Sequence, residues 1–313
     1  MNISTERIFL GCVLKASDMV MYGANSIVKK YARFPLWLPL PCHMEHGWTA
    51  ISSALASDLS VKKGLMLVYS QRRQDAWRKE SAVPSAIIGS PFVLYRRMNK
   101  IMLESTATGT IVFPSHSTNE LDAVFDIDDF CGQLNAIPEK FKPVTVCLHF
   151  IDVNKGLDKH YIKNGLNVVS AGPKHNLDFV NNFYEIVSKH KYSCSNEVGS
   201  YSFYCVEMGL PFFLIGESPE IINIGGDKNA PKSSRITDWD IGKKATDIFQ
   251  TGPITKISAN QKEFVYNEMG VGDSIEPLSL NKMLWHSFWQ EKYLFVLPLY
   301  YLINLYRKIR KVT

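Results

Sequence analysis

Residues 191–216 read KYSCSNEVGSYSFYCVEMGLPFFLIG, and this stretch decides the fold class. It predicts a short strand, a polar turn, a helix and a second buried strand. A helix N-terminus presents unpaired N–H groups and a partial positive charge, so it suits a phosphate group. At that helix start the turn carries hydroxyls, an amide, a carboxylate and a glycine, from Ser195, Asn196, Glu197, Gly199 and Ser200.

The serines of this turn have two interpretations. Ser195 or Ser200 can cap an ordinary helix, or its hydroxyl can donate to a phosphate oxygen beside the helix amides. Glu207 follows Ser200 by two helical turns on roughly the same face, where its carboxylate could accept hydrogen bonds from ribose hydroxyls.

Length and composition limit the possible classes of protein. A chain of 313 residues favours two domains over one small core. The net charge of +5 fits an anionic partner such as a nucleotide sugar or a membrane surface, and falls well short of a nucleic-acid footprint. The six cysteines are scattered without a CxxC pair, which favours reduced, buried thiols and a cytosolic compartment.

Neither end of the chain predicts a membrane-spanning helix. Residues 1–18 do not form a secretory signal, because Glu6 and Arg7 interrupt a short apolar run. Residues 293–306 are apolar and aromatic, and a basic tail follows them, so this segment is better suited to lying in the membrane interface than to crossing it. The alternative is a final helix that packs on the core and ends in a solvated basic segment.

Apolar runs alternate with helical segments through most of the chain. This rhythm predicts an α/β fold with parallel sheets whose ligands bind at the carboxyl ends of the strands. A short apolar run at 37–41 opens the series. Strands are expected at 65–69, 86–88, 110–113, 144–150 and 166–170. Helices are expected at 70–80, 158–164 and 179–189.

The small, polar run at 105–109 suggests a domain boundary. It gives an N-terminal domain at 1–104, a second domain at 105–277 and a C-terminal segment at 278–313. Ser279 is expected to cap the last helix, and residues 217–232, rich in Gly, Pro and Ser, are expected to form a mobile loop.

Polar turns end the predicted strands in succession, and all would point into one crevice if the two halves face each other. His46 is the best general-base candidate, because a histidine with its ordinary pKa accepts a proton at cytosolic pH. Glu45 could orient its ring. His116, flanked by Ser115 and Ser117, could stabilise a leaving phosphate without a metal. Equally, His46 can be structural, and the serines can simply open a helix.

Several classes of site are excluded or disfavoured. The chain has no GxxxxGK[ST] loop, no GxGxxG motif opening a strand–helix unit, no GxSxG elbow and no zinc-ligand spacing. The acidic cluster of Asp122, Asp126, Asp128 and Asp129 is best interpreted as solvated charge, although Asp126 and Asp128 leave open a DxD-type metal site.

In order and spacing, residues 35–216 resemble the two-domain, GT-B type bacterial glycosyltransferases of surface polysaccharide synthesis, near the CDP-glycerol glycerophosphotransferases and CMP-sugar transferases. The matching pieces are Glu45-His46-Gly47, the turn at 88–92, the Pro-containing turn at 113–117, and the donor-site unit at 194–200 followed by Gly209-Leu210-Pro211. The Asp-Tyr-Ser-Ser signature of the glycerophosphotransferases is absent, which favours a sugar donor.

This resemblance implies two facing Rossmann-like domains with a C-terminal amphipathic helix. It implies that His46 activates an acceptor hydroxyl, that His116 and the serines hold donor phosphate, and that Glu207 contacts ribose. The implied partners are a nucleotide-sugar donor, a glycan or lipid-linked acceptor and an anionic membrane surface, on the inner face of the cytoplasmic membrane. No cofactor or metal is implied beyond the nucleotide sugar as co-substrate. The alternatives are a polyol-phosphate transferase and a non-catalytic assembly protein.

Overall fold

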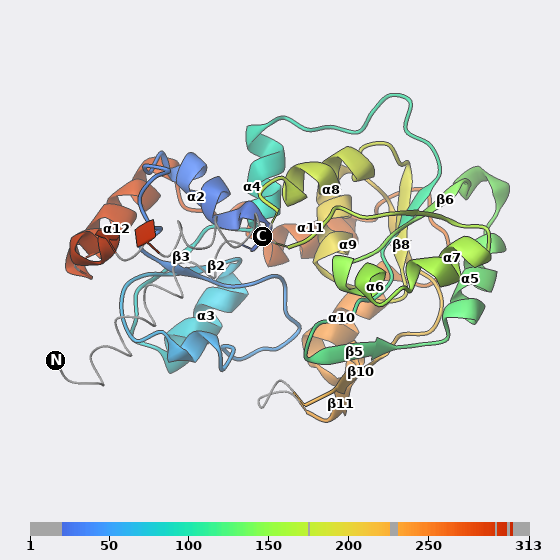
Figure 1. The fold of residues 1–313 in the computed structure, drawn as a ribbon, viewed down its shortest axis with the longest axis horizontal. Helices are drawn as coiled ribbons and strands as arrows, with labels where there is room; N and C mark the ends of the chain where they lie inside the picture. Colours follow the sequence, from blue (N-terminus) through green and yellow to red (C-terminus); the bar gives the residue numbers. More distant parts are fainter. Residues whose placement is uncertain (1–20, 175, 226–230, 292, 299–300, 303–313) are drawn as a thin grey trace.

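The computed structural model describes residues 21–174, 176–225, 231–291, 293–298 and 301–302. Within them the strands form two parallel sheets and one small antiparallel sheet, with helices around them (Figure 1). The protein is therefore a mixed α/β protein with parallel sheets, as the sequence predicts. Short 3-10 helices lie at Met21–Gly23, Asp58–Ser60, Glu139–Phe141, Ile236–Asp238 and Tyr293–Val296.

The first parallel sheet has the strand order β1-β2-β3. Its strands are β1 (His43–Met44), β2 (Met66–Val68) and β3 (Ser85–Ile87), and its helices are α2 (Ala24–Ala32), α3 (Gln71–Glu80) and α4 (Pro91–Met98). The Ser70 hydroxyl caps α3 by accepting from the backbone N–H of Arg73. The apolar run at 37–41 is not a strand: the pairing with β2 falls at His43 and Met44 instead.

The second parallel sheet has five strands in the order β7-β6-β4-β8-β9. They are β4 (Thr110–Val112), β6 (Val144–Cys147), β7 (Asn167–Val169), β8 (Tyr192–Ser195) and β9 (Phe212–Leu214). From β4 the chain first builds outward through β6 and β7, and then returns to place β8 on the other side of β4. The strand order therefore reverses between β4 and β8, the position at which open α/β sheets bind ligands.

Neighbouring strand residues face opposite sides of this sheet, and both sides are covered. Ile111 and Phe212 belong to the buried cluster that includes α8 (Phe179–Val187) and α9 (Ser200–Met208). Val112 and Phe213 belong to the cluster on the other side. That side carries α5 (Ile127–Asn135) and α7 (Asp158–Lys163), and α6 (Phe150–Asn154) lies at the end of β6. Burial on both faces explains the continuous apolar runs of these strands.

The antiparallel sheet was not predicted from the sequence. It has the order β11-β10-β5, with β5 at Leu121–Val124, β10 at Glu220–Asn223 and β11 at Ser233–Ser234. The segment 217–232, expected to be a loop, thus contains a strand, while residues 226–230 lie outside the described part.

The helices α10 (Asp240–Phe249), α11 (Ala259–Glu268) and α12 (Pro277–Gln290) follow this sheet in the sequence. Glu276 rather than Ser279 precedes α12, because Pro277 already occupies its first turn.

The two parallel sheets share one core. Leu67 of β2, Phe92 of α4 and Ile111 of β4 belong to a single buried cluster, which extends to Leu284 and Phe288 of α12. Residues 105–109 join the two sheets without dividing this cluster. The domain limits at 104/105 and 277/278 stay predictions. Most of the C-terminal tail, including residues 303–313, lies outside the described residues.

Candidate functional site

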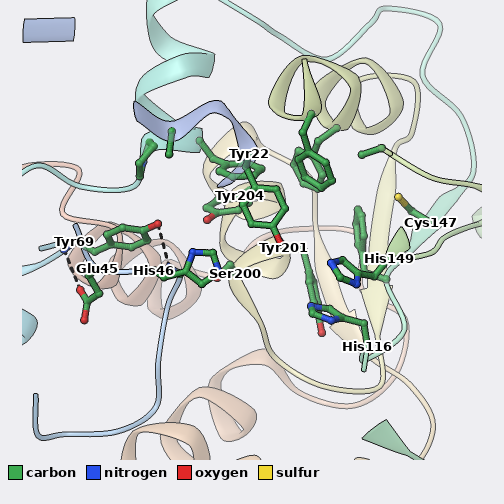
Figure 2. Close-up of a pocket in the computed structure, with 18 of the residues that line it drawn as sticks. Tyr22, Glu45, His46, Tyr69, His116, Cys147, His149, Ser200, Tyr201 and Tyr204 are labelled. Atoms are coloured by element: carbon green, nitrogen blue, oxygen red, sulfur yellow. Dashed lines mark hydrogen bonds between the residues drawn. The ribbon is translucent and has the colours of Figure 1, made fainter. Parts of the chain in front are cut away.

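A cavity of about 220 Å³ lies between the carboxyl ends of the two parallel sheets. One wall comes from the turns after β1, β2 and β3, and the opposite wall comes from the turns after β4, β6 and β7 and the first turn of α9. Aromatic side chains line much of it, among them Tyr22, Phe92, Tyr201 and Tyr204 (Figure 2). Of the four polar turns predicted to converge, those at 43–49, 88–91 and 113–118 contribute lining residues, and the turn at 195–200 contributes only Ser200.

His46 stands in this cavity directly after β1. Its ring stacks on Tyr22, with ring centroids 5.8 Å apart and an angle of 9° between the planes. Burial among the cavity walls lowers the pKa of His46, and the charges of Lys174 and His116 lower it further. The imidazole is nevertheless accessible from the cavity. A neutral, accessible imidazole at cytosolic pH is the state that a general base requires.

The loop that carries His46 is fixed by its neighbours. Gly47 has a left-handed backbone (φ 70°), which glycine adopts without strain, and its N–H donates to the hydroxyl of Tyr69 at 3.3 Å. The buried Glu45 forms an ion pair with Arg73 and accepts from the backbone N–H of Tyr69 at 3.2 Å. Both Glu45 oxygens thus have partners other than His46. Contrary to expectation, Glu45 holds the loop and does not orient the ring.

Two histidines stack on the opposite wall. The rings of His116 and His149 have centroids 4.1 Å apart, and His116 Nδ1 lies 3.0 Å from the carbonyl oxygen of Ser117 (Figure 2). Burial lowers the pKa of His149 to about 3, and the charges of His116 and Lys174 add to this effect, so His149 is neutral. Both of its ring nitrogens are shielded from solvent and lack a partner within the described residues.

Sequence reasoning missed His149. It follows β6 in the run VTVCLHF, where an apolar strand pattern conceals a polar residue at the carboxyl end. Its position after the carboxyl end of β6 could have identified it, because residues at the carboxyl ends of parallel strands lie at the edge of the sheet that binds ligands.

The switch point between β4 and β8 is closed by hydrogen bonds between their loops. Asn196 Oδ1 accepts from the backbone N–H of Ser115 at 2.8 Å, and Glu197 Oε2 accepts from the Ser115 hydroxyl at 2.9 Å. Burial raises the pKa of Glu197 to about 7, while the hydrogen bond from Ser115 opposes this rise. The predicted residues Ser115, Asn196 and Glu197 are therefore brought together, but none of them lines the cavity.

The predicted serines have mainly structural partners. Ser195 is buried, and its hydroxyl lies 3.0 Å from that of Tyr201. Ser117 is buried too, and its N–H donates to Asp152 at 3.3 Å. Ser200 lines the cavity and accepts from the backbone N–H of Trp48 at 3.0 Å, so it links the loops of the two sheets.

The start of α9 differs from the prediction as well. Gly199 is its N-cap, and neither Ser195 nor Ser200 takes that place. A Cβ atom at Gly199 would lie 2.7 Å from the Tyr201 ring, so this close approach requires glycine. Ser200 and Tyr201 of the first turn of α9 both face the cavity, which places the helix N-terminus at its edge.

Glu207 is not a cavity residue. It forms ion pairs with Arg96 at 2.6 Å and with Arg97 at 2.9 Å, which join α9 to α4. The helical spacing from Ser200 is as expected, but the far end of α9 points to α4, so the structure does not support ribose contact by Glu207.

The acidic stretch has structural roles. Asp126 caps α5 by accepting from the N–H of Asp129 at 2.9 Å, Asp122 pairs with Lys155, and Asp128 accepts from Asn164 at 3.0 Å. Among the residues that the structure describes, no group of three His, Cys, Asp or Glu side chains could hold a metal ion. The described helices also include none that is both long and apolar enough to span a bilayer.

No family model and no curated protein matches this chain. Among solved structures it is similar to a histidine-to-asparagine variant of the wall teichoic acid polymerase TagF soaked with CDPG, at 11% identity and a TM-score of 0.34. That match covers 72% of this chain and 57% of the polymerase, so the chain spans little more than half of that protein's length.

Two other solved structures are similar at the same level. One is the UDP-GlcNAc 2-epimerase of Neisseria meningitidis bound to UDP-GlcNAc, at 11% identity, 84% and 78% coverage of this chain and of that chain, and a TM-score of 0.37. The other is the pneumococcal O-GlcNAc transferase GtfA with UDP and GlcNAc, at 8% identity, 82% and 52% coverage, and a TM-score of 0.35. Likenesses this loose assign neither a fold nor an activity to the chain.

Proposed function

We propose that this protein is a glycosyltransferase with two facing lobes of the GT-B kind. It would transfer a sugar from a nucleotide-activated donor to a cell-surface glycan or a lipid-linked acceptor, on the inner face of the cytoplasmic membrane. One observation carries the proposal: His46 from one parallel sheet and the His116–His149 stack from the other line the same cavity. Strand ends that converge in this way are suited to holding an acceptor on one side and a donor on the other.

The proposed reaction needs a base and a stabilised leaving group. His46 takes the proton of the acceptor hydroxyl while that oxygen bonds to the sugar's anomeric carbon. The bond between this carbon and the donor phosphate breaks, and the nucleotide leaves with the electron pair. His116 and the N-terminus of α9 would stabilise the negative charge on the leaving phosphate. These groups supply the stabilisation without a metal ion.

The second candidate is a polyol-phosphate transferase, because His46 would activate a hydroxyl in the same way for attack on phosphorus. Incubation with radiolabelled CDP-glycerol, CMP-sugars and UDP-sugars separates the two. We expect label transfer from a sugar nucleotide; transfer from CDP-glycerol alone would replace the first proposal by the second.

A thermal-shift measurement on the same nucleotides tests the non-catalytic alternative. A nucleotide at 100 times its Kd should stabilise the folded protein by about 2.7 kcal/mol. No shift with any nucleotide at millimolar concentration would favour an assembly protein without a donor site.

A further inference from the structure

Exposed apolar side chains gather on α12 and on the segments that follow α2 and α12, two helices that contact each other at one end of the molecule (Figure 1). Trp37 is 65% exposed and Phe295 is 75% exposed, although both are large aromatic residues. Other exposed apolar side chains of these segments are Leu36, Trp289, Leu294, Tyr301 and Leu302. We call these seven residues the aromatic surface.

The aromatic surface is assembled from segments distant in sequence. The Tyr301 hydroxyl donates to the carbonyl oxygen of Trp37 at 2.8 Å, which joins the turn after α2 to the segment after α12. Trp289 stacks on Trp285, with ring centroids 6.4 Å apart, and Trp285 in turn packs on Phe34. Exposed apolar side chains gathered in this way are typical of an interaction site.

The turn that presents Leu36 and Trp37 is held rigidly. Lys29 of α2 is buried, and its ammonium donates to the carbonyl oxygens of Leu36, at 3.1 Å, and of Leu38. Leu38 is buried in the main core, so the turn has an anchored base and an exposed tip. A fixed turn loses little conformational freedom when its tip enters a partner.

Exposed basic side chains lie beside the segments that carry the aromatic surface. Arg33 is exposed at the end of α2, where its carbonyl oxygen accepts from Asn281 of α12 at 3.2 Å. Lys62 and Lys63 are exposed beside Gly64, which packs against Ser287 and Glu291 at the end of α12.

We propose that the aromatic surface docks on an anionic lipid bilayer, with its Trp, Tyr and Phe side chains at the level of the headgroups and its cations against lipid phosphates. Aromatic side chains prefer this interface, and each nearby Lys or Arg adds attraction to anionic lipid. A second copy of the chain would fit poorly, because a symmetric dimer would set these cations against each other. The inference extends the membrane location given in the proposed function, but it does not rest on the proposed glycosyl transfer.

Vesicle co-sedimentation tests this proposal. We expect the protein to bind vesicles of phosphatidylcholine containing about 30% phosphatidylglycerol at least about tenfold more tightly than pure phosphatidylcholine, with binding weakened by salt. The W37S/F295S double variant should bind the mixed vesicles at least about tenfold more weakly than the unchanged protein does. The matched control, M102S/I162S, removes exposed apolar side chains elsewhere and should bind as the unchanged protein does.

Three results would overturn the proposal. The first is equal binding of W37S/F295S and the unchanged protein to mixed vesicles. The second is a dimer that W37S/F295S converts to a monomer while the unchanged protein ignores vesicles, which would identify a second copy as the occupant. The third concerns sedimented complexes with brominated lipid. If the lipid quenches the fluorescence of the unchanged protein and of the Trp37→Phe variant to the same extent, Trp37 does not contact the bilayer. All three leave transfer to a soluble acceptor unaffected, so failure here is distinguishable from failure of the proposed reaction.

Discussion

Replacing His46 with alanine is expected to lower the rate of sugar transfer by about a hundred- to ten-thousand-fold. The reason is the position of this imidazole, which is accessible in the cavity and faces the turns of the opposite sheet. Nucleotide affinity should change little, because we propose that the donor binds at the opposite wall. The measurement is kcat for transfer together with the Kd of the nucleotide by calorimetry.

The dependence of activity on pH tests the role of His46 independently. His46 must be neutral to accept a proton, and its pKa is lowered from 6.5 by burial. Activity should therefore rise with pH along an acid limb below pH 6.5 and level off above it. His160→Ala, on the exposed surface of α7, is the matched control and should keep full activity. An active His46→Ala enzyme, or an acid limb above 6.5, would remove His46 from the reaction.

Replacing Arg73 with alanine is expected to destabilise the protein by about 3–5 kcal/mol. Arg73 is buried, pairs with Glu45 and donates to the carbonyl oxygens of Ile51 and Ser53, both at 2.8 Å. Its loss leaves a buried carboxylate without its cation. The free energy of unfolding, measured by urea denaturation, reports this loss directly.

The control for Arg73 lies on the same helix. Arg78 is exposed near the end of α3, so Arg78→Ala should change stability by less than about 0.5 kcal/mol. A Glu45→Gln/Arg73→Met protein should recover part of the stability, because neither buried charge then lacks a partner. Equal stability of the Arg73→Ala and Arg78→Ala proteins would contradict the role of the pair in fixing the His46 loop.

The sequence predicts the parallel strands well because burial on both faces leaves an unbroken apolar signal. Leu67 and Val68 lie in one such run, and Ile111 and Val112 in another. The rule that ligand-binding turns follow these strands then places His116 at the site, whereas His46 follows β1, which carries no such apolar run. The sequence analysis missed His149 because it was assigned to the strand at 144–150. The rule applies to it as well, since it follows β6.

The elements that the sequence could not supply depend on non-local partners. β1 is two residues long in a polar stretch, and only its pairing with β2 defines it. The antiparallel strands β5 and β10 are half-exposed and come from distant segments. Helical spacing placed Glu207 near Ser200. It could not predict that Glu207 pairs with Arg96, which lies on another helix. Ion pairs between elements are set by the fold and not by the local pattern.

The most direct test of the shared cavity is a nuclear magnetic resonance titration of histidine side chains labelled with carbon-13. Adding a nucleotide sugar to the protein should shift the imidazole signals of His46, His116 and His149, and leave those of His160 and His286 in place. Saturating nucleotide that shifts only His160 or His286, or no histidine, would contradict a donor site between the two sheets.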